Sequence, residues 1–417
     1  MLKTHSCGEL TKKEVGKKVT LAGWVDTLRI QGKVSFLILR DREGITQCFL
    51  NNDLTKKVST LSVESVVLVE GKVKARPENQ VRKEVSTGEI ELEAENIEVI
   101  SAAETPLPIE VKEDSTTNLD KRLDYRFLDV RRKRINAIFT IRSKVYQYTV
   151  EFFSNEGFIN INSPKLTESG VESGAAEFKI PYFKKTASLA QSPQVYKQMF
   201  VVSGLERVYE IGSVFRAEKS HTTRHLTEFT GIDMEMGFIK DEHDVMDVVE
   251  KYFKYLVENL NKNCKEELKL LNVELKFPSK IPRLEYEEIR KLLKAEGKII
   301  ADDDDLDAEA EVLLGKIVEK KFKSDFVFAL NYPWAKRPFY HMRPEGSKKG
   351  TKSFDLIYRG VEIGTGAQRE HRLEILEKQA KEKGIDFKQM KFYRDIFRYG
   401  VPPHGGIGLG LDRITEQ

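Results

Sequence analysis

The stretch Phe215–Phe229, FRAEKSHTTRHLTEF, places a dense set of charges between two phenylalanines. The flanking runs RVYEIGSVFRAE and FTGIDMEMGF have the composition of two β-strands, which predicts a hairpin-like loop between them. The loop and its base carry Arg216, Glu218, Lys219, His221, Arg224, His225 and Glu228.

These residue types suit a polyphosphate. A triphosphate needs cations that bridge its oxygens, and arginine does this in a bidentate manner. Adenine needs a flat partner, which Phe229 would supply on one face. For any single residue a solvated hairpin is the more common explanation, whereas the complete set favours a polyphosphate site.

Helical spacing and short strands surround this stretch. Apolar residues recur at helical spacing over 123–158, 241–270, 284–298 and 301–322. Four aspartates at the start of the last segment complement the helix dipole and are expected to stay solvated, not to bind metal. Further strands are expected in FININSPKL, FVFALNYP, SFDLIYRGVEIGTG and GGIGLGLDR. This mixture predicts an α+β domain with a largely antiparallel sheet.

Five short runs rich in Val, Ile, Leu and Thr precede that domain, separated by turn or polar segments. They are 18–25, 34–40, 45–50, 64–75 and 89–100. Five strands in this length predict a small barrel of the oligonucleotide-binding (OB) type, with a plain sandwich as the alternative. The next segment, 101–118, is predicted to be a linker, because Pro106 and Pro108 block both a helix and a central strand.

Composition limits the class of protein. A chain of 417 residues suggests two or three domains, and its net charge of +3 argues neither for nor against nucleic acid. Three distant cysteines indicate a reducing compartment, and no His/Cys spacing suggests zinc. The start of the chain is polar, and no run of about 20 apolar residues predicts a membrane span. We therefore expect a cytoplasmic protein.

Three motifs resemble those of class II aminoacyl-tRNA synthetases. FRxE, a loop and (R/H)xxxF resemble motif 2, GLGLDR at 408–413 resembles motif 3, and the helix and strand ending at Pro164 resemble motif 1. Longer runs resemble the aspartyl-tRNA synthetases of archaeal and eukaryotic type over essentially the whole chain. They include LAQSPQVYKQM, RHLTEFTGIDMEM, FDLIYRGVEIGTGAQREHR and FRYGVPPHGGIGLG.

The resemblance implies an α+β fold in which an OB-type barrel precedes a class II catalytic domain with an antiparallel sheet and flanking helices. The implied bounds are 1–104 for the anticodon-binding barrel, 105–122 for a hinge and 123–417 for the catalytic domain. It further implies a homodimer through motif 1. The implied activity is ATP- and Mg²⁺-dependent activation of L-aspartate and its transfer to tRNA-Asp, with tRNA-Asn left open as a second acceptor.

The resemblance also assigns nucleotide contacts. Arg216 would hold the α-phosphate and stabilise the charge that develops during attack, Glu218 would hold the adenine amino group, and Arg413 would hold the γ-phosphate or stack on adenine. Arg216 and Arg413 are therefore the implied catalytic residues. The implied ATP set is Arg216, Glu218, Arg224, His225, Leu226, Phe229, Glu362, Gly410 and Arg413, and the implied Mg²⁺ ligands are Glu362 and Thr365, with Asp355 a weaker candidate.

For the amino acid, Arg369 would pair with the substrate side-chain carboxylate, Lys197 and Gln194 would add contacts, and Glu172 would meet the α-ammonium. The implied aspartate set is Glu172, Gln194, Lys197, Arg216, Asp233, Thr365 and Arg369. Without the resemblance, Lys197 and Arg369 would be taken as ordinary surface ion pairs. In the barrel, Phe36 and Gln47 match anticodon readers, and a core position in VSFLIL is the alternative for Phe36.

Two other functions stay open. One is the asparaginyl-tRNA synthetase, because aspartate and asparagine are isosteric. The other is a catalytically impaired fragment that binds tRNA or single strands. The chain ends four residues after Arg413, so the tail that follows motif 3 in the family is expected to be missing and Arg413 to be loosely held.

Overall fold

The computed structural model describes residues 1–168, 177–217, 226–346, 349–388 and 390–417. Its contacts divide the chain into two compact units, each with its own core. The first unit contains residues 1–110 and 115–126, and the second contains 111–114 and 127–417.

The first unit is a closed five-stranded barrel of order β1-β2-β3-β5-β4. Its strands are β1 (Lys18–Gln31), β2 (Val34–Arg40), β3 (Ile45–Leu50), β4 (Val66–Ala75) and β5 (Ile90–Ser101). Alternate side chains of each strand are buried, for example Leu37 and Leu39 of β2, as a small barrel requires. The predicted strands and barrel are confirmed, and the alternative of a plain sandwich is wrong.

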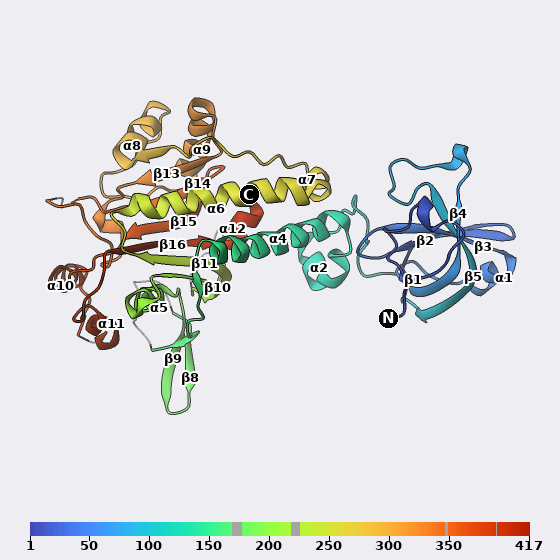
Figure 1. The fold of residues 1–417 in the computed structure, drawn as a ribbon, viewed down its shortest axis with the longest axis horizontal. Helices are drawn as coiled ribbons and strands as arrows, with labels where there is room; N and C mark the ends of the chain where they lie inside the picture. The colour runs from blue at the N-terminus through green and yellow to red at the C-terminus, as the bar shows by residue number, and fades with distance from the viewer. Residues whose placement is uncertain (169–176, 218–225, 347–348, 389) are drawn as a thin grey trace. The chain divides into compact units, whose positions relative to one another are not determined.

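An eight-stranded sheet of order β12-β13-β14-β15-β16-β11-β10-β6 forms the centre of the second unit (Figure 1). The pairs β12–β13 and β10–β6 are parallel, and the neighbours between them are antiparallel. The strands are β6 (Ile159–Asn160), β10 (Arg207–Phe215), β11 (Glu228–Gly237), β12 (Arg283–Glu285), β13 (Phe326–Leu330), β14 (Ser353–Tyr358), β15 (Val361–Gln368) and β16 (His404–Gly410). The prediction of a largely antiparallel sheet is confirmed.

A small second sheet, β7-β9-β8, carries a hairpin that stands away from the large sheet (Figure 1). Its strands are β7 (Leu166–Thr167), β8 (Lys179–Tyr182) and β9 (Lys185–Leu189).

Two long helices, α4 and α6, pack on one face of the large sheet and form its main core with phenylalanines of β13 and β14. The described helices are α1 (Asn52–Lys57), α2 (Leu119–Asp124), α3 (Arg126–Asp129), α4 (Lys133–Asn155), α5 (Gln194–Phe200), α6 (Glu242–Asn263), α7 (Lys265–Leu271), α8 (Tyr286–Ala295), α9 (Ala308–Phe322), α10 (Leu373–Glu382), α11 (Lys391–Ile396) and α12 (Leu411–Glu416). Among these described helices, none is long and apolar enough to cross a membrane.

Three predicted helices differ in their bounds. The segment 123–158 is divided among α2, α3 and α4, the segment 241–270 is divided into α6 and α7, and helix α9 starts at Ala308, not at 301. Asp307 caps α9 by accepting the Ala310 backbone N–H at 2.8 Å, so the four preceding aspartates lie before the helix. Three of those aspartates form ion pairs, Asp302 with Arg290, Asp304 with Lys336 and Asp305 with Arg337.

Candidate functional site

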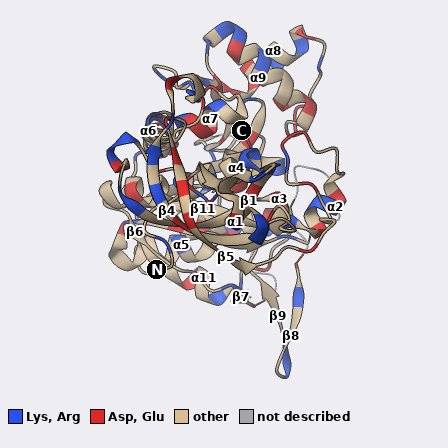
Figure 2. Ribbon diagram, turned by 90° about the vertical axis from the view of Figure 1, so that its right-hand side faces the viewer, with Lys and Arg blue, Asp and Glu red and all other residues tan. Residues whose placement is uncertain are grey.

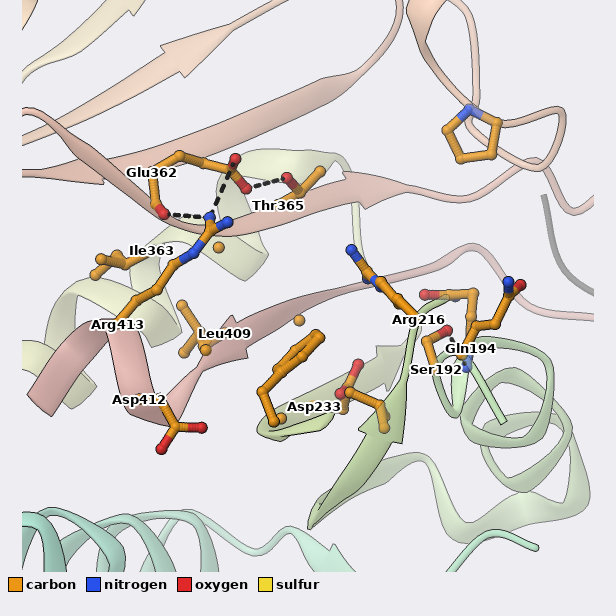
Figure 3. Close-up of a pocket in the computed structure, with 18 of the residues that line it drawn as sticks. Ser192, Gln194, Arg216, Asp233, Glu362, Ile363, Thr365, Leu409, Asp412 and Arg413 are labelled. Atoms are coloured by element: carbon orange, nitrogen blue, oxygen red, sulfur yellow. Dashed lines mark hydrogen bonds and ion pairs between the residues drawn. The ribbon is translucent and has the colours of Figure 1, made fainter. Parts of the chain in front are cut away.

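A cavity of about 410 Å³ lies over strands β10, β11, β15 and β16 of the second unit (Figure 3). The predicted site residues that line it are Gln194, Arg216, Leu226, Phe229, Asp233, Glu362, Thr365, Arg369, Gly410 and Arg413. Residues that are far apart in the sequence therefore converge on one pocket.

The other predicted site residues lie elsewhere. Lys197 and Asp355 are buried behind the cavity wall and are not part of its lining. Phe36 and Gln47 belong to the barrel. Glu172, Glu218, Arg224 and His225 lie outside the described residues.

Glycines of β16 let the neighbouring strands and their side chains approach β16 closely. A Cβ on Gly406 would lie 2.1 Å from the carbonyl oxygen of Met234, and a Cβ on Gly408 would lie 3.1 Å from Asp233 Oδ1. Real Cβ atoms do not approach backbone oxygens at the first of these distances, so the run HGGIGLG follows from the crowding of β16 against β11.

Within the cavity, Arg216 lies beside an aromatic ring. Its guanidinium carbon is 5.3 Å from the centre of the Phe229 ring, and its backbone N–H donates to the Thr227 carbonyl at 2.9 Å. Because Arg216 follows β10 and Phe229 lies on β11, the pairing of these strands sets the two side chains together. A cation over an aromatic face suits a charged, planar ligand.

Arg413 of α12 is anchored to β15. Its Nη1 donates to the Glu362 carbonyl at 2.7 Å and lies 3.4 Å from Glu362 Oε2 (Figure 3). Thr365 Oγ1 donates to Glu362 Oε1 at 3.0 Å. The expectation of a loosely held Arg413 is therefore wrong, because contacts with β15 fix the side chain.

Asp355 on β14 is a buried carboxylate with one oxygen in use. Arg337 Nη2 donates to Asp355 Oδ2 at 2.7 Å, while Oδ1 has no hydrogen-bond partner among the described residues. Burial, opposed by Arg337 and reinforced by the charge of Glu362, raises the pKa of Asp355 to about 7. An unpaired oxygen near a second carboxylate is an environment that a hard cation would stabilise, and this donor set fits Mg²⁺.

Arg369, which also lines the cavity, is held in a buried network. Its Nε and Nη2 donate to the two carboxylate oxygens of Glu235 at 2.9 and 3.3 Å, and Nη2 also donates to the Gly406 carbonyl at 3.1 Å. Its Nη1 lies 3.0 Å from His341 Nε2, which must accept because arginine can only donate. These bonds occupy four of the five N–H groups, so one on Nη1 is left for a ligand as far as the described residues go.

Lys197 of α5 completes this network. Its Nζ donates to Asp233 Oδ1 at 2.9 Å and lies 3.4 Å from Glu235 Oε2. Nearby, Gln194 is buried and its side-chain Nε2 has no hydrogen-bond partner in the described part of the chain. Arg369 and the unpaired amide of Gln194 line the pocket, and Lys197 lies behind its wall, an arrangement suited to a carboxylate.

Charge and burial oppose one another in this network. Burial would raise the pKa of Glu235, but the charges of Arg369 and Lys197 lower the pKa overall. Burial lowers the pKa of His341 well below its usual value, and the Arg369 charge lowers that pKa further. His341 is therefore neutral at physiological pH, and its Nε2 can accept the hydrogen bond from Arg369.

The proposed anticodon residues share the outer surface of the barrel. Phe36 alternates with buried Leu37 and Leu39, and its ring lies 5.8 Å from that of Phe49 on β3 in an edge-on arrangement. Gln47 donates to Glu91 Oε2 at 3.1 Å. The alternative of a core position for Phe36 is wrong, because the side chain is on the partly exposed face of β2.

Sequence reasoning missed Glu235, His341 and Asp412. A signal existed for Glu235, because it follows Asp233 by two residues in a strand and so lies on the same face. Asp412 precedes Arg413 and accepts the Thr230 N–H at 3.0 Å. His341 gave no signal, because its position beside Arg369 comes from an isolated bridge between distant segments.

Comparisons with known proteins agree with both units. A family model described as tRNA synthetases class II (D, K and N) matches residues 118–417, and one described as OB-fold nucleic acid binding domain matches residues 19–100. The aspartate–tRNA(Asp) ligase of Pyrococcus abyssi is 44% identical over 423 residues, covering 100% of this chain and 95% of that protein. The aspartate–tRNA(Asp/Asn) ligase of Aeropyrum pernix is 42% identical, covering 97% of this chain and 91% of that protein.

Solved structures give the same picture. Asparaginyl-tRNA synthetase from Pyrococcus horikoshii, complexed with asparaginyl-adenylate, matches with a TM-score of 0.91 and 33% identity over 100% of this chain and 94% of that one. Aspartyl tRNA synthetase from Entamoeba histolytica matches with a TM-score of 0.86 and 33% identity over 98% of this chain and 87% of that one.

Proposed function

The chain belongs to the class II tRNA synthetases of the D, K and N group, and from this we propose that it is an aspartate–tRNA ligase. It would use ATP to convert L-aspartate to aspartyl-adenylate and then transfer the aspartyl group to tRNA-Asp. Relatives named for tRNA(Asp) alone and relatives named for tRNA(Asp/Asn) are both similar to this chain, so tRNA-Asn stays open as a second acceptor. The observation that carries the proposal is the convergence of the predicted cations and carboxylates on one cavity.

In the first step, an oxygen of the aspartate α-carboxylate attacks the α-phosphorus of ATP. The new bond forms as the bond to the bridging oxygen breaks, and pyrophosphate leaves with that electron pair. No proton moves, so the task is to hold the phosphate and stabilise negative charge. Arg216 would do this at the α-phosphate with Phe229 against adenine, and Arg413 would hold the outer phosphates.

In the second step, a hydroxyl of the terminal ribose of tRNA attacks the aspartyl carbonyl. The ester bond forms, the bond to the phosphate oxygen breaks, and AMP leaves. The hydroxyl proton must be accepted during the attack. The phosphate oxygen that leaves is an acceptor for this proton in the adenylate itself.

Enzymes of this class use ATP, typically with Mg²⁺. Glu362 and Thr365 would hold the ion together with phosphate oxygens, with Asp355 as a further candidate ligand, and Thr365 also donates a hydrogen bond to Glu362. When bound, Mg²⁺ neutralises charge on the phosphate oxygens. The unpaired Asp355 Oδ1 supports this assignment.

The buried network would select aspartate. Arg369 and Lys197 would face the substrate side-chain carboxylate, and the unpaired amide of Gln194 would add a donor. Asp233 and the acidic Glu172, the latter outside the described residues, would meet the α-ammonium. Asp233 and Glu235 already neutralise the two cations, so the selection would come from the donors that remain, one N–H on Arg369 Nη1 and the amide of Gln194. A substrate carboxylate offers two acceptor oxygens to these donors and an amide offers one, which supports aspartate over asparagine.

The remaining assignments concern the whole protein. Residues 1–104 would bind the anticodon through Phe36 and Gln47, 105–122 would be the hinge and 123–417 the catalytic domain. A homodimer would form through α4 and the strand region ending at Pro164, and sedimentation showing a monomer at working concentration would refute it. We expect the enzyme to act in the cytoplasm.

The test of the reaction is ATP–pyrophosphate exchange with aspartate and asparagine in parallel. Exchange that requires aspartate supports the proposal, whereas exchange that requires asparagine assigns the chain to the asparagine enzymes. If neither amino acid supports exchange while tRNA still binds, the chain is a catalytically impaired tRNA-binding protein. The Arg216→Gln variant is the matched control, because it removes the guanidinium and keeps a polar side chain.

A further inference from the structure

The hairpin of β8 and β9 ends in a two-residue turn made of Phe183 and Lys184, since Tyr182 pairs with Lys185. The hairpin projects from the second unit (Figure 1), and its tip carries basic side chains (Figure 2). None of the site residues discussed above lies in this tip, so the proposed function leaves its composition unexplained.

The tip exposes two aromatic rings to solvent. The Phe183 side chain is 93% exposed and that of Tyr182 is 46% exposed. Their ring centres are 4.9 Å apart in an edge-to-face arrangement, in which one ring covers one face of the other. The high exposure of Phe183 shows that its ring is still open to solvent. An aromatic face open to solvent is suited to stacking with a nucleic-acid base.

Phe183 also has an unfavourable backbone conformation. Its φ is +50°, a region in which Gly, Asn and Asp are strongly preferred at the first position of a two-residue hairpin turn. A phenylalanine there destabilises the hairpin compared with asparagine. Strain of this kind in an exposed residue points to a role other than folding.

The charge around the rings has one sign. Lys179, Lys184 and Lys185 are exposed, and the sequence from 178 to 189 contains no Asp or Glu. In the described part of the chain, none of the three lysines forms an ion pair. A basic tip with open aromatic faces complements a polyanion that carries flat bases.

The hairpin leads directly to the cavity. Strand β9 ends at Leu189, and Gln191 and Ser192 line the pocket just beyond it. Gln191 follows Lys185 by six positions, which corresponds to about 20 Å if the chain is extended. A tRNA whose terminal ribose enters the pocket must pass its acceptor arm near the mouth, within reach of such a hairpin.

We propose that the tip Tyr182–Lys185 binds the acceptor arm of tRNA, with Phe183 stacking on an unpaired base and the lysines contacting phosphates. This inference rests on the proposed function, because it takes tRNA as the substrate. It adds a contact surface on the second unit to the anticodon contacts proposed for the barrel. The surface would serve the transfer step and not the formation of the adenylate.

The variant Phe183→Asn separates folding from binding. Asparagine tolerates the positive φ, so the variant should melt at the same temperature as the parent or higher. Loss of base stacking should raise the dissociation constant for tRNA, and the KM for tRNA in aminoacylation, at least about fivefold. ATP–pyrophosphate exchange with aspartate should not change, because no tRNA takes part in it.

The matched control is Phe238→Asn. Phe238 is also exposed, at 70%, and has a φ of +59°, but it belongs to the turn that follows β11. This control should leave tRNA binding unchanged. A second variant, Phe183→Trp, keeps a stacking surface and should retain an affinity for tRNA close to that of the parent. Lys184→Glu should raise the dissociation constant for tRNA, and the increase relative to the parent should be largest at low salt.

Each result bears on the inference. It is overturned if Phe183→Asn binds tRNA as the parent does, if the Phe238 control weakens binding equally, or if Phe183→Asn dissociates a dimer in sedimentation, which would make the tip a subunit contact. The proposed function fails in a different way, through absence of aspartate-dependent exchange in the parent protein. Direct tRNA binding by filter retention tests the hairpin even in that case.

Discussion

At the scale of single residues, Arg369 decides what the amino-acid end of the cavity can bind. Its guanidinium is buried and already donates to Glu235, His341 and Gly406. A guanidinium with most of its N–H groups fixed presents the last one in a set direction, which is the preorganisation that a specific carboxylate site needs. Lys197 adds a second fixed cation behind Asp233.

Arg369 and Glu235 should contribute jointly to the free energy of unfolding, whereas aspartate-dependent exchange should require Arg369 whether or not Glu235 is present. We expect Arg369→Gln to lower the free energy of unfolding by about 3–5 kcal/mol, because it leaves the buried Glu235 carboxylate without its main partner. The double variant Arg369→Gln/Glu235→Gln should recover part of that loss. Both should lack aspartate-dependent exchange. Denaturant unfolding of Arg369→Gln, of Glu235→Gln and of the double variant measures the coupling free energy. An Arg369→Gln variant as stable as the parent would contradict the prediction.

His341 should make stability depend on pH on the acid side. Its folded-state pKa is depressed by burial and by the charges of Arg369, Arg337, Lys197 and Lys383. Below about pH 6.5 the unfolded state binds a proton that the folded state refuses, so stability is lost as the pH falls.

The variant His341→Gln should therefore flatten the dependence of the unfolding free energy on pH below about 6.5. Part of the slope should persist, because burial also lowers the pKa of His404. Denaturant titrations at several pH values measure the slope, and His5→Gln near the N-terminus is the control. An unchanged slope in His341→Gln would show that the histidine is not held neutral by folding.

At the scale of elements, the short helix α12 is tied to the sheet and to α4 by one carboxylate. Asp412 Oδ2 accepts the Thr230 backbone N–H at 3.0 Å, and Oδ1 accepts from Arg142 of α4 at 3.1 Å. Arg142 also donates to Thr230 Oγ1 at 3.0 Å. These bonds join α4, β11 and α12, and they fix the direction in which the adjacent Arg413 enters the cavity.

We expect Asp412→Ala to slow ATP–pyrophosphate exchange more than it lowers stability. Displacement of a catalytic group by about 1 Å can reduce a rate about 100-fold, and Asp412 holds the helix that carries Arg413. Glu416→Ala on the exposed end of the same helix is the matched control and should leave exchange unchanged. Far-UV circular dichroism checks the fold, and equal exchange rates in the two variants would show that Asp412 does not position Arg413.

At the scale of the whole molecule, two units with separate cores would divide the work between reading tRNA and chemistry. The cavity is built entirely from residues of the second unit, and Phe36 and Gln47 lie on the first. Changes on the barrel surface should therefore act on tRNA recognition without altering adenylate formation.

The variant Phe36→Ala tests this division. Loss of a stacking surface should raise the KM for tRNA by about fivefold or more, while exchange with aspartate and ATP continues at the parental rate. Tyr399→Ala, which removes an aromatic side chain 77% exposed on the second unit, is the control. A drop in exchange caused by Phe36→Ala would contradict the separation of the two activities.

Local sequence patterns were sufficient to predict the strands of the barrel and the outward position of Phe36. The five strands of the barrel follow from alternation within each run, and the outward position of Phe36 follows from its buried neighbours Leu37 and Leu39, because side chains alternate along a strand. The cavity residues of motif 2 and of β15 and β16 were identified by resemblance to a family whose members place the same residue types in the same order. Helix bounds were less accurate, since a cap such as Asp307 depends on one hydrogen bond.

Other features could be decided only by the tertiary structure. Arg369 and Glu235 are 134 residues apart, and nothing in either neighbourhood predicts their ion pair. The anchoring of Arg413 by Glu362 and the approach of His341 to Arg369 likewise require strands to pair and loops to close first. Sequence periodicity reports which face of an element is apolar, because burial is a local pattern. Which polar groups meet in the interior depends on how distant elements pack, and that is a property of the folded chain alone.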